Sequence, residues 1–421
     1  MPLDSDARRR FVFLQGPTNF LFAKVAARLR SHGHAVERIN VCVGDQLFWK
    51  GPAVDYRGRR EDWPGFVASF FDRHRTTDLV LLGEKRPHHR EAIALAAERG
   101  IEVTVTDFGY LRPDWIVVER DGLNGGSRFP RDPAAIERMS EGLPAPQRHV
   151  LYPHRPANQA LWDMAFHLSS AFFPFTFPHF RRHTLRHPVP NYLATGLRFA
   201  RAPIEARRAE ALARLLDERG AFYLFAMQME DDYSLRGYSP FPDLDTPMRE
   251  AVDSFARHAR KDTAFVFKVH PLDPGLKGWR RRIAAMAARA GVTGRVHFID
   301  GGDLDALLAS CRGLVTVNST AGLRALELGC PTMALGEAIY RLPGLAFEGR
   351  LDDFWNGARA PDPVFVGKAL RAMGAALHVR GSMYDAAGIE AAAQGMAYRL
   401  HHGLVNVPLA EVLRAEPLGA P

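Results

Sequence analysis

Hydrophobic residues in the first half of the chain form short continuous runs that alternate with segments of helical periodicity. Four runs are typical of strands buried on both faces: Phe11–Leu14, Ala35–Val43, Leu79–Leu82 and Ile101–Val105. Apolar residues spaced by three and four predict helices over Phe20–Arg30 and Glu91–Arg99. Strands that alternate with helices in this way predict parallel βαβ units, and hence a Rossmann-like domain.

The same alternation resumes after a helix predicted over Ile204–Arg219. Strands are predicted over Phe222–Ala226, Ala264–Val269, Val296–Ile299, Gly313–Val317 and Thr332–Leu335. The helices between them are Met248–His258, Trp279–Ala290, Leu304–Ser310 and Ala321–Leu328. A second doubly wound domain is therefore expected.

Three parts follow from this pattern. Residues 1–200 are expected to form an N-terminal Rossmann-like domain, and residues 201–378 a C-terminal one. Asn158 to about Arg208, rich in aromatic residues, proline and arginine, is interpreted as a partly helical connection. The closing helices, Val364–Leu377 and Ile389–His401, are alanine-rich, and residues 379–421 are expected to pack back on the first domain.

Two α/β domains in tandem, with no GxGxxG and no GxxxxGK[ST] motif, disfavour dinucleotide oxidoreductases and P-loop NTPases. The GT-B-type glycosyltransferase architecture fits better, with an active site in the cleft between two Rossmann-like domains. Ligands of such open sheets bind beyond the carboxyl ends of the strands, so the loops at those ends are the first candidates.

Composition narrows the class further. The 421 residues include 55 Lys and Arg against 47 Asp and Glu, with 47% hydrophobic and 24% charged residues, as in an ordinary globular protein. The formal net charge of +8 would suit an anionic partner. Nucleic acid is excluded as that partner, because zinc-finger spacing, an RNP-type motif and basic heptads are all missing from the sequence.

The cysteines and the termini indicate a cytoplasmic protein. Cys42, Cys311 and Cys330 are odd in number and far apart in sequence, so neither a disulfide framework nor a zinc knuckle is expected. The least charged stretch, Met164–Phe180, contains a histidine and two prolines, which argues against a membrane span. The N-terminal MPLDSDARRRFVFLQG is not typical of a secretory signal.

Polar side chains gather after three strands of the second domain. They are Gln228, Glu230, Asp231 and Asp232 after the first strand, Lys268 and His270 after the second, and Asn318, Ser319 and Thr320 after the fourth. Ser319 or Thr320 can cap the next helix, whose free N–H groups attract an anion, and Lys268 and His270 add donors. These groups together predict a phosphate ligand; singly, each is as well explained as a helix start or a loop residue.

The acidic loop needs its own explanation. Glu230 and Asp232 lie two positions apart and face the same side of an extended segment. One can act as nucleophile or base while the other orients the substrate, and a solvated acidic turn is the alternative. The DLD segments at Asp243 and Asp303 resemble metal motifs but are interpreted as structural. His88 with His89, and His401 with His402, are expected on the surface.

The chain contains the motifs FLQGPTNFLF, a GD before an aromatic pair, and GYLRPDW, followed in order by QxExD, KxHP and NST. Together these motifs resemble those of the KpsS-type capsule polysaccharide biosynthesis and export proteins. The resemblance runs from about Phe11 to Leu400. It implies a β-Kdo transferase that uses CMP-Kdo to start an oligo-Kdo linker on a lyso-phosphatidylglycerol-type lipid. The reaction would occur at the cytoplasmic face of the inner membrane, by a protein bound peripherally there with other capsule assembly proteins.

The resemblance also implies residue roles. The CMP phosphate would be held by Lys268, His270, Asn318, Ser319 and Thr320, with Gln228 also on the donor side. Asp232 would be the catalytic carboxylate, with Glu230 and His270 beside it, and Glu327 a ribose contact. The family retains anomeric configuration, which suggests a glycosyl-enzyme intermediate on Asp232. Ser234 departs from the family, where an amide side chain is expected.

The acceptor side is expected in the first domain, at Gln15, Gly16, Thr18, Asn19 and Asp45. Because CMP leaves as a phosphate monoester, neither a metal nor another cofactor is expected. The run Phe172–His187 would meet anionic lipid headgroups or pack between domains, and both interpretations stay open. A transferase or epimerase using another nucleotide sugar, and a non-catalytic partner in capsule export, are the competing functions.

Overall fold

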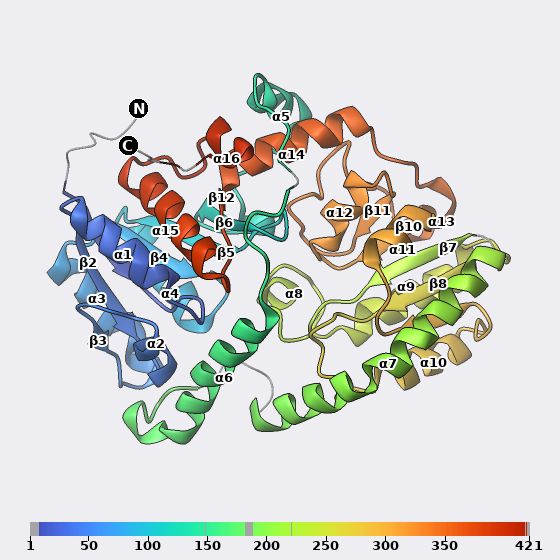
Figure 1. Ribbon diagram of the computed structural model, residues 1–421, viewed down its shortest axis with the longest axis horizontal. Coiled ribbons are helices and arrows are strands. Elements are labelled where there is room, and N and C mark those ends of the chain that lie inside the picture. The colour runs from blue at the N-terminus through green and yellow to red at the C-terminus, as the bar shows by residue number, and fades with distance from the viewer. Residues whose placement is uncertain (1–7, 148, 182–187, 220, 417, 419–421) are drawn as a thin grey trace. The chain divides into compact units, whose positions relative to one another are not determined.

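The computed structural model describes residues 8–147, 149–181, 188–219, 221–416 and 418 (Figure 1). The chain divides into two compact units, each built around its own sheet. The first comprises Met1–Pro130, Glu137–His183 and Ala369–Pro421, and the second comprises Arg131–Ile136 and Thr184–Lys368. Both boundaries fall before the ones expected at residues 200 and 378.

The first unit has a seven-stranded sheet. Its strands are β1 (Arg10–Phe13), β2 (Ala35–Asn40), β3 (Val54–Asp55), β4 (Asp78–Leu82), β5 (Glu102–Phe108), β6 (Trp115–Arg120) and β12 (His378–Arg380). They lie in the order β12-β6-β5-β4-β1-β2-β3, and β6 runs antiparallel to both of its neighbours. The segment from β3 to β5 has the Rossmann strand order, which places a topological switch point between β1 and β4.

Helices from both ends of the chain cover this sheet. They are α1 (Leu21–Ser31), α2 (Val43–Leu47), α3 (Trp63–His74), α4 (Pro87–Glu98), α15 (Ala386–His401) and α16 (Ala410–Arg414). Helix α6 (Pro156–Phe172) packs on α2. Helix α15 packs on α1 and on β12, and Met396 and Leu400 share a core with Val25 and Leu29. Two further helices, α5 (Pro133–Ser140) and α14 (Pro363–Leu377), begin among residues of the second unit and end in the first.

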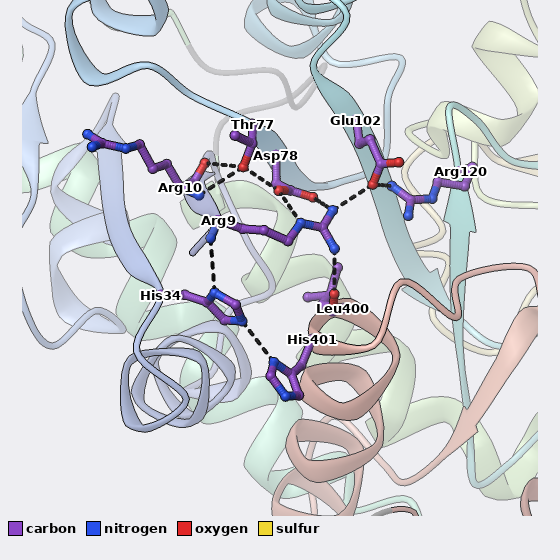
Figure 2. A network of polar contacts seen from close by, with 9 residues as sticks. All are labelled: Arg9, Arg10, His34, Thr77, Asp78, Glu102, Arg120, Leu400 and His401. Carbon is purple, nitrogen blue, oxygen red and sulfur yellow. Dashed lines mark hydrogen bonds and ion pairs between the residues drawn. The ribbon is translucent and has the colours of Figure 1, made fainter. Parts of the chain in front are cut away.

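A network of ion pairs and hydrogen bonds ties helix α15 to the start of the first sheet (Figure 2). The Arg9 guanidinium donates to both carboxylate oxygens of Asp78, at 2.8 Å for Nε, and to Glu102 at 2.6 Å. It also donates to the carbonyl oxygen of Leu400 at 2.8 Å. Beside it, ring nitrogens of His34 and His401 lie 2.9 Å apart. The C-terminal segment is thus an integral part of the first unit.

The second unit has a five-stranded parallel sheet. Its strands are β7 (Phe222–Ala226), β8 (Ala264–Lys268), β9 (Val296–Ile299), β10 (Gly313–Thr316) and β11 (Thr332–Ala334), in the order β11-β10-β7-β8-β9. Its helices are α7 (Pro188–Arg219), α8 (Tyr233–Gly237), α9 (Asp245–His258), α10 (Trp279–Arg289), α11 (Leu304–Ser310), α12 (Ala321–Glu327) and α13 (Leu351–Gly357). The prediction of two Rossmann-like domains in tandem is confirmed.

Burial on both faces explains why the strands of the second sheet were readable as continuous apolar runs. Phe225 and Phe267 pack in one core with Phe255 and Trp355. Leu224, the residue directly before Phe225 in β7, packs in a separate core on the other face. The switch point of this sheet lies between β7 and β10, where β10 is added on the side opposite β8.

His378 makes the first unit sensitive to acid. Its ring is fully buried, donates from Nδ1 to the Met373 carbonyl at 2.9 Å and accepts from the Tyr110 N–H at Nε2 at 3.0 Å. Burial lowers the pKa of His378 to about 3, and Arg399 and Arg380 act in the same direction. Protonation of Nε2 would place a hydrogen on that nitrogen, facing the Tyr110 N–H, so this hydrogen bond would be lost. The unfolded chain therefore binds the extra proton more readily, and stability falls as the pH drops from about 6.5 towards 3.

We expect the free energy of unfolding to lose about 1.4 kcal/mol per pH unit from this one site over that range. The measurement is the urea unfolding midpoint at several pH values for the wild type and for His378→Gln. The variant should be less stable at neutral pH and should show a shallower pH dependence. Some dependence should persist, because burial also lowers the pKa of His88 and of His34 to about 4. An unchanged slope in the variant would assign the acid sensitivity to other groups.

Candidate functional site

Two loops at the carboxyl end of the second sheet are joined by a pair of amide side chains. Gln228 follows β7 and Asn318 follows β10, on the two sides of the switch point. The Gln228 Nε2 donates to Asn318 Oδ1 at 2.8 Å, and the Asn318 backbone N–H donates to Gln228 Oε1 at 2.9 Å. Both residues are about 95% buried. The two predicted donor-side residues therefore fix the two loops to each other.

Asn318 also positions the short helix α8. Its Nδ2 donates to the carbonyl oxygens of Ser234 at 2.7 Å and of Tyr238 at 3.4 Å. With both ends of its amide engaged in the loops, Asn318 acts here by positioning the neighbouring residues. Direct contact of its side chain with a phosphate would require these hydrogen bonds to break. Ser234, where an amide was expected from the family pattern, contributes its backbone carbonyl to this arrangement.

The acidic residues of the β7 loop have different surroundings. Glu230 forms an ion pair with Lys277, whose Nζ also lies 3.1 Å from Asp245 Oδ2. Burial alone would lower the pKa of Lys277, but its hydrogen bonds to the two carboxylates outweigh burial and raise it. Asp232 instead caps α8, where its Oδ1 accepts from the Ser234 N–H at 2.8 Å. Glu230 is thus neutralised by a cation that sequence patterns did not single out, whereas Asp232 is bonded to backbone.

Lys268 and His270 occupy the loop after β8. Lys268 is 7% exposed and its Nζ donates to the Gly301 carbonyl, so it holds the neighbouring β9 loop. Burial lowers the pKa of Lys268, although Asp300 opposes the shift. His270 Nδ1 accepts from the Leu272 N–H at 3.1 Å, which puts the proton of the neutral ring on Nε2. His270 is therefore set up as a hydrogen-bond donor rather than as a base at Nε2.

Ser319 and Thr320 lie where β10 turns into α12. Ser319 Oγ accepts from the Ala321 N–H at 3.2 Å, while Thr320 is the N-cap residue by backbone position and makes no side-chain cap bond. Tyr340, buried to 99%, donates its hydroxyl to the Ser319 carbonyl at 2.7 Å. The structure thus brings Ser319 and Thr320 to the same edge of the sheet as Gln228, as the sequence suggested.

Glu327, expected as a ribose contact, lies at the other end of α12. Its carboxylate pairs with Arg324, which also donates to Asp305 of α11 at 3.0 Å from Nε. The seven-residue helix separates Glu327 from Ser319 by about 10 Å along its axis. The structure therefore does not bring Glu327 together with the strand-end residues.

Gly322 lets Tyr340 support the Ser319 loop. A Cβ atom at position 322 would overlap the Tyr340 ring and hydroxyl. We expect Gly322→Ala to displace the ring, break its bond to Ser319 and destabilise the second unit by about 1–3 kcal/mol. The matched control is Gly367→Ala in α14, where a Cβ meets no atom within 4 Å. This substitution should stabilise the protein by up to about 1 kcal/mol, because alanine favours the helix over glycine. Thermal unfolding of both variants tests this; equal stability of the two would show that Tyr340 is not tightly fitted.

A family model described as capsule polysaccharide biosynthesis protein matches residues 77–384, which cover all of the second unit and about half of the first. The chain belongs to this family. It is 28% identical to the capsule polysaccharide export protein KpsS of Escherichia coli, over 84% of this chain and 91% of that protein. It is 27% identical to the capsule polysaccharide modification protein LipB of Neisseria meningitidis serogroup B, over 85% of this chain and 87% of that protein.

Among solved structures, the chain resembles the β-Kdo 2,7 transferase of Thermosulfurimonas dismutans KpsC, at 13% identity and a TM-score of 0.42. The match covers 93% of this chain and 99% of that one. At this level of similarity, we draw no functional conclusion from it.

In the first unit of this capsule biosynthesis protein, the expected acceptor residues mostly face inwards. Asn19, 1% exposed, accepts from the Leu21 N–H at 2.8 Å and donates to the Met383 carbonyl at 2.8 Å. Asp45, also 1% exposed, accepts from Arg38 at 3.0 Å. A Cβ atom on Gly16 would overlap the ring of Phe22, so that glycine permits close packing. These residues stabilise the β1 and β2 loops.

Gln15 contacts a cation that the sequence did not reveal. Its Oε1 accepts from Arg86 at 2.6 Å, and both line a small cavity with His88 and His89. The cavity of about 10 Å³ has room for about one water molecule, so it is not a substrate pocket in this arrangement. The expectation that His88 and His89 lie on the surface is wrong for His89, which is 1% exposed and bonds to the Gly83 carbonyl at 2.8 Å. Packing of α4 on the sheet buries it.

The DLD segments have structural roles, as expected. Asp243 accepts from the Thr246 N–H and hydroxyl at 2.8 Å, and Asp303 caps α11. Asp245 and Asp305 form ion pairs with arginines. Within the described part of the chain, histidine, cysteine and acidic side chains form no cluster of three or more that could hold a metal ion.

Of the run Phe172–His187, for which lipid contact and packing between domains were both expected, residues 182–187 lie outside the described part. Phe172, Phe173 and Phe175 are exposed by 67%, 49% and 74%, whereas Phe177 is buried. No helix among the described residues is both long and apolar enough to cross a bilayer.

Proposed function

We propose that this protein is a retaining glycosyltransferase that moves Kdo from CMP-Kdo to a (lyso)phosphatidylglycerol-type lipid, at the start of the linker for a capsule polysaccharide. The observation that carries the proposal is the amide pair between Gln228 and Asn318. It joins the loop bearing Asp232 to the loop bearing Ser319, at the switch point where ligands of such sheets bind. Membership of a capsule biosynthesis family supports the same conclusion.

The donor phosphate would be held by neutral donors and one cation. His270 offers its Nε2–H, and Ser319 and Thr320 offer hydroxyls at the start of α12. CMP leaves as a phosphate monoester, so stabilising its charge replaces protonation by a general acid. Lys268, which is bonded to Gly301, contributes positive charge to this edge of the sheet. With a single donor phosphate, this proposal requires no metal.

Asp232 would act as the nucleophile. In the first displacement a bond forms between its carboxylate and the anomeric carbon, while the bond from that carbon to the CMP phosphate oxygen breaks. In the second, a hydroxyl of the acceptor attacks the same carbon and passes its proton to water, while the bond from that carbon to the Asp232 carboxylate breaks. Two inversions give net retention. Glu230, paired with Lys277, would orient the substrate rather than attack it.

The test is to incubate the purified protein with a CMP-Kdo-generating mixture and a fluorescent lyso-phosphatidylglycerol, and to follow the lipid by mass spectrometry. We expect Kdo to be added, and CMP but not UDP or GDP to raise the melting temperature. Stabilisation by UDP instead would favour another nucleotide sugar. If neither a mass shift nor nucleotide binding is seen, the transferase proposal is wrong, and the non-catalytic role suggested by the name of the E. coli export relative would be favoured.

A further inference from the structure

The N-terminal half of α7 exposes a stripe of aliphatic side chains. Val189, Leu193, Leu197 and Ile204 are exposed by 39%, 66%, 62% and 54%. Spacings of four, four and seven residues place them on one face of the helix, about 23 Å long from first to last. Stripes of this kind normally pack against a core, so an uncovered one indicates an interaction surface.

The opposite face of α7 is firmly attached to the second unit. Arg198 Nε donates to Asp300 at 2.9 Å, and its NH1 donates to the Asp273 carbonyl at 2.6 Å. Further along, Ala209 and Leu216 are buried in the core beneath β7. The helix therefore cannot rotate to bury its aliphatic stripe in its own unit without losing these contacts.

The charges around the stripe are mostly positive, and the exposed Glu210 lies 4.0 Å from Arg214. Residues 188–204 include no aspartate or glutamate. Beyond Ile204, the exposed Arg207 and Arg214 continue the same face, at three and ten residues further along. The first acidic residue, Glu205, is only 16% exposed in its side chain and pairs with Arg208 and Arg280. The face thus passes from aliphatic to cationic along one helix.

We propose that this face of α7 docks on an anionic lipid bilayer. The aliphatic half would lie in the boundary between headgroups and acyl chains, and Arg207 and Arg214 would contact lipid phosphates, as in interfacial amphipathic helices. A second copy of the chain fits this face less well. Two copies of the helix packed parallel would bring their arginines together, and packed antiparallel they would bury the arginines against leucines. The docking does not depend on the proposed transfer reaction.

Docking there would also bring the candidate donor site close to the lipid. Arg198 holds the loop that follows His270, and Leu272 and Leu276 in that loop are exposed by 40% and 45%. This consequence alone rests on the proposed function, since it places a lipid acceptor near the loop that would bind CMP.

The experiment is flotation of the purified full-length protein with vesicles of phosphatidylcholine, with and without phosphatidylglycerol. We expect binding to the anionic vesicles only. Leu193→Asp with Leu197→Asp should abolish it, and Arg207→Gln and Arg214→Gln should each weaken it about fivefold, the equivalent of about 1 kcal/mol per basic residue. Arg214 lies 4.0 Å from the exposed Glu210, whereas Arg207 forms no ion pair with any residue that the structure describes. Unchanged melting temperatures would show that the fold of each variant is intact.

The matched control is Val364→Asp, which changes a residue of the second unit that is 63% exposed. It should bind anionic vesicles as the wild type does. Absence of wild-type binding, equal binding to neutral vesicles, or full binding by the Leu193→Asp, Leu197→Asp variant would overturn the proposal. The proposal would also be overturned if light scattering shows a wild-type dimer that the Leu193→Asp, Leu197→Asp variant cannot form, while neither protein binds vesicles. Nucleotide stabilisation, measured in the same preparations, shows separately whether the donor-site proposal holds.

Discussion

Asp232→Asn should reduce sugar transfer by a factor on the order of 10³ or more and leave the fold intact. Asparagine keeps the oxygen that accepts from the Ser234 N–H and is itself a favoured N-cap residue, so α8 should stay in place. What is lost is the negative charge needed for attack on the anomeric carbon. Transfer should therefore fail although CMP still raises the melting temperature.

Glu230→Gln is the matched control, since it neutralises a second carboxylate of the same loop. Its partner Lys277 keeps a second carboxylate, Asp245, at 3.1 Å, so the variant leaves no cation without an ion pair. We expect a small drop in melting temperature and no more than about tenfold loss of transfer. Initial rates of product formation for both variants decide the assignment. An inactive Glu230→Gln beside an active Asp232→Asn would exchange the two roles.

Arg399→Met should destabilise the first unit by about 3–5 kcal/mol. Arg399 is fully buried, and its guanidinium donates to four backbone carbonyls, of Leu404, Val407, Ala375 and His378. Burial lowers the pKa of Arg399 to about 9, although Glu411 opposes the shift. Methionine fills much of the volume but offers no donor, so the four carbonyls would lose their bonds to the guanidinium. Those of Ala375 and Leu404 would keep the backbone N–H groups of Leu409 and Val407 as donors.

The measurement for Arg399 is chemical unfolding followed by circular dichroism. Arg399→Lys should recover only part of the loss, because one ammonium cannot reach both pairs of carbonyls. The exposed Arg289→Met in α10 serves as control and should change stability by less than about 0.5 kcal/mol. If Arg399→Met unfolds like that control, the carbonyls find other donors and the arginine does not hold the C-terminal segment.

The second sheet was well predicted because β7, β8, β10 and β11 are buried on both faces, and only the edge strand β9 is partly exposed. Runs such as Phe222–Ala226 and Ala264–Lys268 have no polar interruption, and the helices between them have one apolar stripe each. The antiparallel β6 and the short edge strand β12 were missed. Strand β12 has only three residues, two of them His378 and Arg380, and becomes a strand through its pairing with β6.

The candidate site was predicted in position but less well in detail. Strand ends meet at one edge of a parallel sheet, so the loops with Gln228, His270 and Ser319 could be placed from sequence. Partners such as Lys277 for Glu230 and Tyr340 for Ser319 depend on tertiary packing over many residues. The only signal for Lys277 was that lysine is rare in this arginine-rich chain.

The return of the chain to the first sheet has a consequence for biosynthesis. Strand β12 and helix α15 complete the first unit, and both are translated after the whole of Thr184–Lys368. The second unit, almost continuous in sequence, can fold while the ribosome is still adding residues. The N-terminal sheet meanwhile keeps β6 as an open edge and α1 without its partner helix. Premature termination before residue 378 should thus leave a folded second unit attached to an aggregation-prone first one.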